Sequence, residues 1–493
     1  MKRNVSLKIA VRLLLVSMLC ITAASCSDEG GKPSADGSEP AKGNDSTVQE
    51  ETEAPLPYAF AQEELDYGGY NFRVLTDHIE EVDILKDELV VGEIVSESVY
   101  NRNMRVEELL NIEISAIEVE NWEDVSPTVQ KYVMAGDDAF DALNAGLIEV
   151  FRASSNGHLL PLHEIETLDT EAEWWDSSIL EAFDFGNGNV YMIAGGIGYW
   201  DDYGLSCMAI NIDLMRRNDM EVPYDAVRAG EWDYEMFHGY IKGFEQDLNG
   251  DGEWDPYDQY GCVDNLDFGS RVGCGFGMFA VDKNESGRPE FRLTEAYYDR
   301  FFALIDQLCN DPALVIMERK FGYDEGGPIF GYGNTLFKPV MVNSLQDELR
   351  KYDFMSTIVP MPKYDENQEN YLNSARDIYC TAYGVPITNS DTDRTGYIMD
   401  AMSYFGELII RPAAIEKQCL VKGVQDMDTV DMINIIFDSK AYDLTYITGW
   451  GSWYSTLWDF VDSGRNNLAS REAQFAKRVN KDIENSLKTF GIE

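Results

Sequence analysis

The sequence predicts an α/β fold divided into more than one domain, and three observations carry this prediction. The chain has 493 residues, which is longer than a single hydrophobic core usually serves. Apolar residues make up 44% of it and aromatic residues 12%, so large cores can form. From residue 71 onward, short strand-like runs alternate with helical spacings of apolar residues, the order typical of a sheet with crossover helices.

The first five predicted elements justify this class. The run NFRVLT at 71–76 is a short strand candidate. Apolar residues over 95–110 recur at helical spacing, and the run at 112–120 alternates as a strand does. A helix is predicted over 125–134, and FDALNAG at 140–146 is the next short strand. Strand, helix, strand, helix and strand together predict a sheet covered by helices.

The charge balance excludes two classes of partner. The chain carries 39 lysines and arginines against 88 aspartates and glutamates, a formal net charge of −49. Such a charge repels phosphate backbones and anionic lipid. We therefore expect neither nucleic-acid binding nor a basic patch that binds membrane.

The amino terminus predicts export and a lipid anchor. Basic residues precede an apolar run that is too short to span a membrane, so residues 1–25 are a predicted signal peptide. Small residues before Cys26 predict cleavage there and lipidation of that cysteine; the alternative is a soluble secreted protein cut nearby. Residues 26–57 are polar, acidic and rich in Gly, Ser and Pro, which predicts a disordered tether.

The loop DLNGDGEWDPYD at 247–258 has the spacing of a calcium-binding loop. Ca²⁺ takes about six to eight oxygens, and alternate residues of a tight loop point their oxygens to one centre. Gly252, at the sixth place, allows the sharp turn. The alternative is a solvated acidic turn. Because no clear helix follows, we expect structural calcium, and its predicted ligands are Asp247, Asn249, Asp251, Glu253, Asp255 and Asp258.

Two short motifs precede this loop. An N-x-D-L turn is formed by Asn211, Asp213 and Leu214, and a W-D-x-x-x-F helix start by Trp232, Asp233 and Phe237. In this order and spacing they resemble the extracellular solute-binding proteins, family 1, which are carbohydrate receptors of ABC importers. The similarity covers roughly residues 68–450, through segments such as SESVYNRNMRVEELLNIEI, EAEWWDSS and IVPMPKYDENQ.

The resemblance implies a two-lobed periplasmic-binding-protein-like fold of type II. Two α/β lobes, joined by several crossings of the chain, would close like a hinge over a ligand. We place the first lobe at 68–200 plus 375–410, and the second at 208–365 plus 411–493. The crossings then fall near GYWDDYGLS and PMPKYDENQEN.

Sugar recognition needs a flat aromatic ring for the apolar face of the sugar and planar polar groups for its hydroxyls. At the first crossing, Trp200 with Asp201 and Asp202 supplies both. The alternative is a polar turn in which Trp200 caps the core.

A second predicted platform is the cluster TGWGSWYSTLW, with Trp450, Trp453, Tyr454 and Trp458, where two flanking glycines suggest a loop that exposes at least one ring. The alternative is packing beneath a C-terminal helix. Asn343, Arg376 and Asp377 are weaker candidates, for which a structural role is the alternative.

These residues and the resemblance predict a monomeric receptor, held by its lipid anchor at the outer face of the membrane. It would capture a sugar or oligosaccharide and deliver it to the permease of an ABC importer. A secreted glycoside-active enzyme is the rival class, but chain order singles out no carboxylate pair, and the motifs GxSxG, HExxH and GxxxxGK[ST] are absent. A third class is a calcium-stabilised surface protein that binds a non-sugar ligand such as a peptide.

Overall fold

The computed structural model describes residues 60, 65–77, 94–322, 327–376, 378–419 and 427–492. The predicted signal peptide, the lipidation site Cys26 and the tether lie outside the described residues, and so does Asp377. In the described ranges, most strands belong to two separate sheets.

The first sheet has the strand order β12-β3-β1-β2. β1 is parallel to both β2 and β3, while β12 is antiparallel to β3. Its centre is apolar on both faces, because Val74 and Leu75 of β1 are both fully buried in different cores. The strands are β1 (Tyr70–Thr76), β2 (Ile112–Glu118), β3 (Ala142–Gly146) and β12 (Thr381–Gly384).

The second sheet has the order β10-β4-β9-β5-β8. β5 is parallel to β8 and β9, whereas β4 is antiparallel to its neighbours β9 and β10. Two short strand pairs, β6 with β7 and β11 with β13, lie outside both sheets. The bounds are β4 (Ser206–Asn211), β5 (Tyr260–Asp264), β6 (Val281–Lys283), β7 (Pro289–Phe291), β8 (Leu314–Ile316), β9 (Thr335–Met341), β10 (Ser356–Val359), β11 (Asn373–Ser374) and β13 (Lys440–Ala441).

The segments that connect the two sheets run along the carboxyl ends of the parallel strands. At the first crossing, Leu205 accepts a hydrogen bond from the amide just beyond β9, 3.0 Å long. At the second, Cys380 accepts one from the amide just beyond β3, also 3.0 Å long. The two crossings meet in a bridge between Leu205 and Ala375. Both carboxyl edges therefore adjoin the crossings, the place where open α/β sheets bind ligands.

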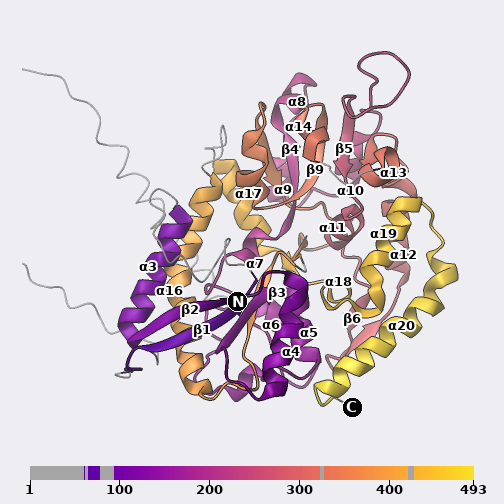
Figure 1. The fold of residues 1–493 in the computed structure, drawn as a ribbon. Helices are drawn as coiled ribbons and strands as arrows, with labels where there is room; N and C mark the ends of the chain where they lie inside the picture. Colours follow the sequence, from indigo (N-terminus) through magenta and orange to yellow (C-terminus); the bar gives the residue numbers. More distant parts are fainter. Residues whose placement is uncertain are drawn as a thin grey trace, which may run out of the picture. The chain divides into compact units, whose positions relative to one another are not determined.

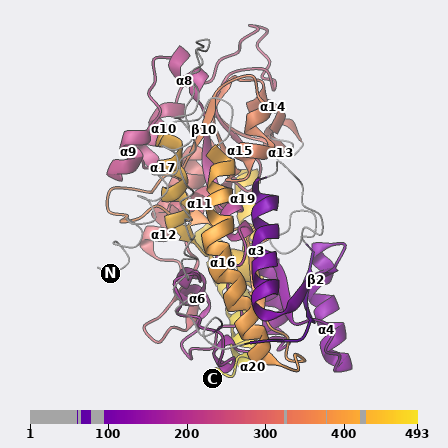
Figure 2. The same cartoon turned by 90° about the vertical axis from the view of Figure 1, so that its left-hand side faces the viewer.

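Helices cover the sheets. The longest, α16, lies alongside α3, as two views at right angles show (Figures 1 and 2). The helices are α3 (Ile94–Leu110), α4 (Val125–Ala135), α5 (Leu147–Ser155), α6 (Ser177–Phe183), α7 (Trp200–Tyr203), α8 (Ile212–Arg217), α9 (Tyr224–Ala229), α10 (Tyr234–Ile241), α11 (Phe268–Gly275), α12 (Glu295–Phe302), α13 (Met317–Phe321), α14 (Gly327–Gly331), α15 (Ser344–Asp347), α16 (Thr392–Cys419), α17 (Met427–Asp438), α18 (Leu444–Thr448), α19 (Trp453–Ser463) and α20 (Leu468–Thr489), with the short turns η1 (Trp122–Asp124), η2 (Leu162–Glu164), η3 (Ala303–Leu308), η4 (Leu349–Lys351) and η5 (Trp450–Ser452).

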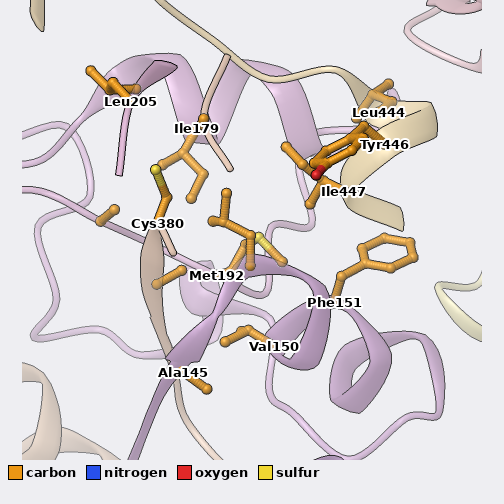
Figure 3. Packing of buried hydrophobic residues seen from close by; sticks show 14 of the residues in the cluster. Ala145, Val150, Phe151, Ile179, Met192, Leu205, Cys380, Leu444, Tyr446 and Ile447 are labelled. Carbon is orange, nitrogen blue, oxygen red and sulfur yellow. The ribbon is translucent and has the colours of Figure 1, made fainter. Parts of the chain in front are cut away.

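One hydrophobic core is shared by both sheets and the C-terminal helices. It joins Phe151 of α5 and Val263 of β5 to Ile447 of α18, all buried. Figure 3 shows part of this core, with Phe151 near Tyr446 and Ile447. Because this core is continuous, the described residues of the two sheets belong to one compact unit. The predicted lobe boundaries stay a prediction.

The two motifs that carried the family resemblance cap helices and fill the core beside the second sheet. Asn211 accepts a hydrogen bond from Leu214, 2.9 Å long, and so caps α8. Asp233 caps α10 in the same way. Trp232 and Phe237 are fully buried, and the Trp232 indole donates to the Pro360 carbonyl at 2.9 Å. The motifs therefore fix helix starts and a core.

The predicted elements of the first sheet are confirmed. The strand expected at 71–76 is β1, the helix over 95–110 is α3, and the strand from Ile112 is β2. The helix expected over 125–134 is α4, and β3 forms within 140–146.

Candidate functional site

Arg376 lies beyond the carboxyl end of β5, in a cluster of two arginines and two aspartates. Its Nη2 is 2.8 Å from Asp267 Oδ2, and its Nη1 is 3.1 Å from Ser270 Oγ. Arg271 Nη1 lies 2.7 Å from Asp264 Oδ1, and Arg271 also reaches Asp267 at 3.5 Å. The second crossing is thereby tied to the loop and helix that follow β5.

Aromatic rings surround this cluster. The Trp458 indole donates to Asp267 Oδ1 at 3.0 Å, and the guanidinium of Arg376 lies 4.7 Å from the ring centroid of Tyr446. Tyr454 stands edge-on to Trp458, with centroids 5.5 Å apart at 87°. Trp458 and Tyr454 are only partly buried, so parts of both rings remain accessible to a ligand. An accessible ring beside planar charged groups can hold a flat polar molecule that has an apolar face.

The charges of the cluster balance. Burial would raise the pKa of Asp267, but the charges of Arg376 and Arg271 outweigh it and lower that pKa. Burial dominates at Asp264 and raises its pKa to about 6, although Arg271 opposes the shift. With each carboxylate facing an arginine, the cluster favours neutral groups over a strongly charged ligand.

A second buried cluster centres on Lys440 of β13. Its Nζ lies 2.9 Å from Asp201 Oδ2, 2.9 Å from Asp202 Oδ1 and 3.0 Å from Asp176 Oδ2. Asp201 and Asp202 belong to α7 at the first crossing, and β13 pairs with β11 before the second crossing. Arg411 of α16 lies 3.8 Å from Asp202. Lys440 thus ties together the segments that connect the two sheets.

Two of the carboxylates around Lys440 have pKa shifts in opposite directions. Burial would raise the pKa of Asp176, but the ammonium of Lys440 and hydrogen bonds from Ser178 lower it to about 2. At Asp201, burial outweighs Lys440 and the neighbouring carboxylate adds to it, so the pKa rises to about 8. Burial opposes the charge of Lys440, yet the three carboxylates hold its pKa well above the ordinary value.

A small pocket adjoins the Lys440 cluster, between α7 and α16. Its lining includes Asp202, Tyr203, Glu407 and Arg411, with a free volume of about 10 Å³. That volume is about the space of one water molecule and is too small for a sugar. A sugar could enter this pocket only if α7 and α16 moved apart.

Trp200 lies in a small core rather than on an open surface. It is buried with Tyr199, Tyr203, Val95 and Ile410. This is the core-capping arrangement that the sequence left as the alternative. Its two acidic neighbours are engaged with Lys440, so a ligand role for Trp200, Asp201 and Asp202 stays a prediction.

In the aromatic cluster, Tyr454 and Trp458 are partly accessible, whereas the predicted ligand residues Trp450 and Trp453 lie in the core. Both side chains are only 3% exposed. The Trp450 indole donates a hydrogen bond to Ser486 Oγ of α20, 3.1 Å long. The Trp453 ring stands edge-on to the ring of Phe475 in the same helix, with ring centroids 5.1 Å apart. Gly449 and Gly451 instead allow left-handed turns that let the chain pass beneath α20.

The two remaining described candidates, Arg376 and Asn343, lie in different surroundings. Arg376 lies at the centre of the first cluster, as described above. Asn343 follows β9, and its amide donates to the Tyr203 carbonyl at 3.1 Å, next to the first crossing. Its role in ligand binding stays a prediction.

The acidic loop is held by its own carboxylates. Asp247 accepts hydrogen bonds from the amides of Gly250 and Gly252, at 2.7 and 2.8 Å. Asp258 is buried and accepts from Leu248 and Asp255. Across the described ranges, no group of three or more His, Cys, Asp or Glu side chains converges to hold a metal. The oxygen donors suit calcium chemically, but these carboxylates would have to turn toward a common centre.

Sequence reasoning missed Asp267, Asp176 and Lys440. No local pattern marks them, because their partners lie far away in the chain. Trp458 was named as part of the predicted aromatic platform, although Trp450 and Trp453 were chosen as its ligand residues. The sequence does not show which of these rings is accessible.

No protein-family model matches the chain, and no curated protein matches it. Among the described residues, no helix is both long and apolar enough to cross a membrane.

Solved structures do share its fold. An ABC substrate-binding protein of Listeria monocytogenes in complex with cycloalternan has a TM-score of 0.53 at 12% identity, over 86% of this chain and 100% of that one. The maltose/maltodextrin-binding domain of Bdellovibrio bacteriovorus, bound to maltotriose, has 0.52 at 14% identity, over 85% and 100%. UspC of M. tuberculosis has 0.55 at 12%, over 84% and 100%. The chain therefore has the predicted α/β periplasmic-binding-protein fold with two sheets.

Proposed function

We propose that this protein captures a sugar or oligosaccharide outside the cytoplasm and delivers it to the permease of an ABC importer. The observation that carries the proposal is the group of Arg376, Asp267 and Trp458 at the carboxyl edge of the second sheet. Solved proteins of this fold are in complex with cycloalternan and maltotriose, which are the same class of ligand.

Each member of the group has a distinct role in this proposal. The accessible part of Trp458 lies under the apolar face of a sugar ring. Asp267 accepts hydrogen bonds from hydroxyls at its edge, because a carboxylate only accepts, and the buried Arg376 holds Asp267 in position. The ligand is neutral, since the two charges already balance. The crossings bend to bring the first sheet's carboxyl edge against the bound sugar.

The proposal includes no turnover of the ligand. A glycoside hydrolase needs one carboxyl group that can give a proton and another that can attack or activate water. Asp264 and Asp267 instead lie against arginines at 2.7 and 2.8 Å. That pairing supports binding rather than hydrolysis.

The predicted anchor and location belong to the same proposal. Lipidation of Cys26 would hold the protein at the outer face of the cell membrane, with residues 26–57 as the tether. Mass spectrometry of the protein purified from membranes tests this. A diacylglycerol on Cys26 is expected, and an unmodified soluble protein would contradict the anchor.

Structural calcium in the acidic loop is also proposed, with Asp247, Asn249, Asp251, Asp255 and Asp258 as side-chain ligands. The support is the ligand spacing and the concentration of carboxylates, which repel one another unless a cation lies among them. This is tested by removing calcium from the protein with a chelator and then titrating the protein with Ca²⁺ in a calorimeter. Binding of one ion is expected, and a flat titration would contradict the proposal.

A thermal-shift screen against mono- and oligosaccharides tests the main proposal. A ligand present at a hundred times its dissociation constant stabilises the folded state by about 2.7 kcal/mol. We expect one class of neutral sugar to raise the melting temperature and to be recovered unchanged. A sugar recovered cleaved would show an enzyme, and stabilisation by peptides alone would show a different ligand class.

A further inference from the structure

A group of exposed aromatic rings lies at the edge of the second sheet opposite the candidate site. Trp254 and Tyr257, before β5, are 43% and 61% exposed, and Tyr332, before β9, is 43% exposed. β5 and β9 begin side by side, with Tyr260 opposite Thr335, so these rings lie near the amino ends of strands whose carboxyl ends adjoin the Arg376 cluster. Large exposed rings that gather in one place mark interaction surfaces.

The rings are held in place. Tyr257 and Tyr332 have centroids 4.5 Å apart at 32°, and the Asn334 side chain donates to the Tyr257 carbonyl at 2.9 Å. Below them, the Tyr260 hydroxyl donates to the Asp255 carbonyl at 2.7 Å. The acidic loop is further fixed by the hydrogen bonds of its own carboxylates. These side chains would therefore lose little conformational entropy when a partner binds.

The chain segment that carries Trp254 and Tyr257 is acidic. Residues 244–260 contain six acidic residues and neither lysine nor arginine. Asp251 and Glu253 are exposed beside Trp254 in the chain. Aromatic faces also attract cations. The protein's own Lys320 shows this, since its Nζ lies 5.0 Å from the Trp254 centroid and 4.6 Å from that of Tyr260.

We propose that Trp254, Tyr257, Tyr332 and the acidic loop form a docking surface for a basic segment of a partner protein. Arginine side chains of the partner would lie on the exposed face of Tyr257 and pair with Glu253, which is not one of the proposed side-chain calcium ligands, as Lys320 already lies on Trp254. Charge complementarity favours this occupant, because the chain carries a net charge of −49 and a second acidic copy would be repelled. The surface is independent of sugar binding at the opposite edge.

Fluorescence anisotropy with a labelled twelve-residue peptide of alternating arginine and serine, at physiological salt, tests the proposal. Because −49 charges attract any basic peptide, the informative variants keep the charge. We expect Trp254→Ala combined with Tyr257→Ala to weaken peptide binding about tenfold. Phe302→Ala is the matched control, since it removes an equally exposed ring from α12, and it should leave binding within twofold.

Three results would overturn the proposal. Equal peptide affinity in the double variant and the wild type would show attraction by charge alone. A dimer of the wild-type protein in sedimentation that Tyr257→Ala dissociates would show a self-association surface. Binding of a labelled oligosaccharide that is lost in Tyr257→Ala and kept in Arg376→Ala would show a carbohydrate platform. Melting curves of every variant establish that it is folded, and the ring variants are expected to keep the melting temperature of the wild type because these rings are exposed.

Discussion

Lys440 should be among the most sensitive positions in the chain. Lys440→Met keeps most of the aliphatic stem and removes the ammonium that lies within 3.0 Å of three carboxylates. Removing one partner of a buried ion pair costs about 3–5 kcal/mol, because the carboxylates that stay charged at pH 7, Asp176 among them, remain buried without compensation. We expect a loss of that size in the free energy of unfolding at pH 7, measured by urea denaturation. Lys477→Met, at an exposed site on α20, should change it by less than about 0.5 kcal/mol.

The pH dependence of this loss has a defined sign. The pKa of Asp176 is lowered in the folded protein to about 2, so its stabilisation is present above pH 3.8 and is lost as the pH falls toward 2. The pKa of Lys440 is raised, so its contribution persists through neutral pH and is lost only in strong alkali. The penalty of Lys440→Met should therefore shrink between pH 4 and pH 2. A penalty below about 1 kcal/mol at pH 7, or one that is constant down to pH 2, would refute this reasoning.

Four further outcomes are expected. Asp176→Asn should lower the free energy of unfolding by about 2 kcal/mol at pH 7 and by little near pH 2, as urea melts at both pH values would show. Trp450→Ala should cost about 3–5 kcal/mol in the same assay, with sugar affinity of the folded fraction unchanged. Arg376→Lys should weaken sugar binding at least about fivefold in calorimetry, because a single ammonium cannot replace a guanidinium that reaches both Asp267 and Ser270. Asp258→Asn should abolish any rise in melting temperature that calcium gives the wild type.

The fold was predictable because its signals are local. Helical spacing over 95–110 and alternation from Ile112 each reflect which face of one element is buried. The motifs at Asn211 and Trp232 were recognisable because a helix cap and a buried indole impose fixed residue types at fixed spacing. These constraints act within a few residues of the chain.

The site was less predictable because its contacts join distant segments. Arg376 lies 109 residues from Asp267, and Lys440 lies 239 from Asp201. The tryptophans show the same limit. Trp450 and Trp458 occur in one cluster of the sequence, yet only the packing of α20 decides that Trp450 is buried while Trp458 remains partly accessible.

The central claim is that a neutral sugar binds on Trp458 at the carboxyl edge of the second sheet. The most direct measurement is isothermal titration of the most stabilising sugar of the panel into the wild type and Trp458→Ala, with Trp254→Ala as the matched control. Stacking on an aromatic ring predicts one binding site and an affinity reduced at least about tenfold in Trp458→Ala only. Equal affinity in the wild type and Trp458→Ala would contradict the account.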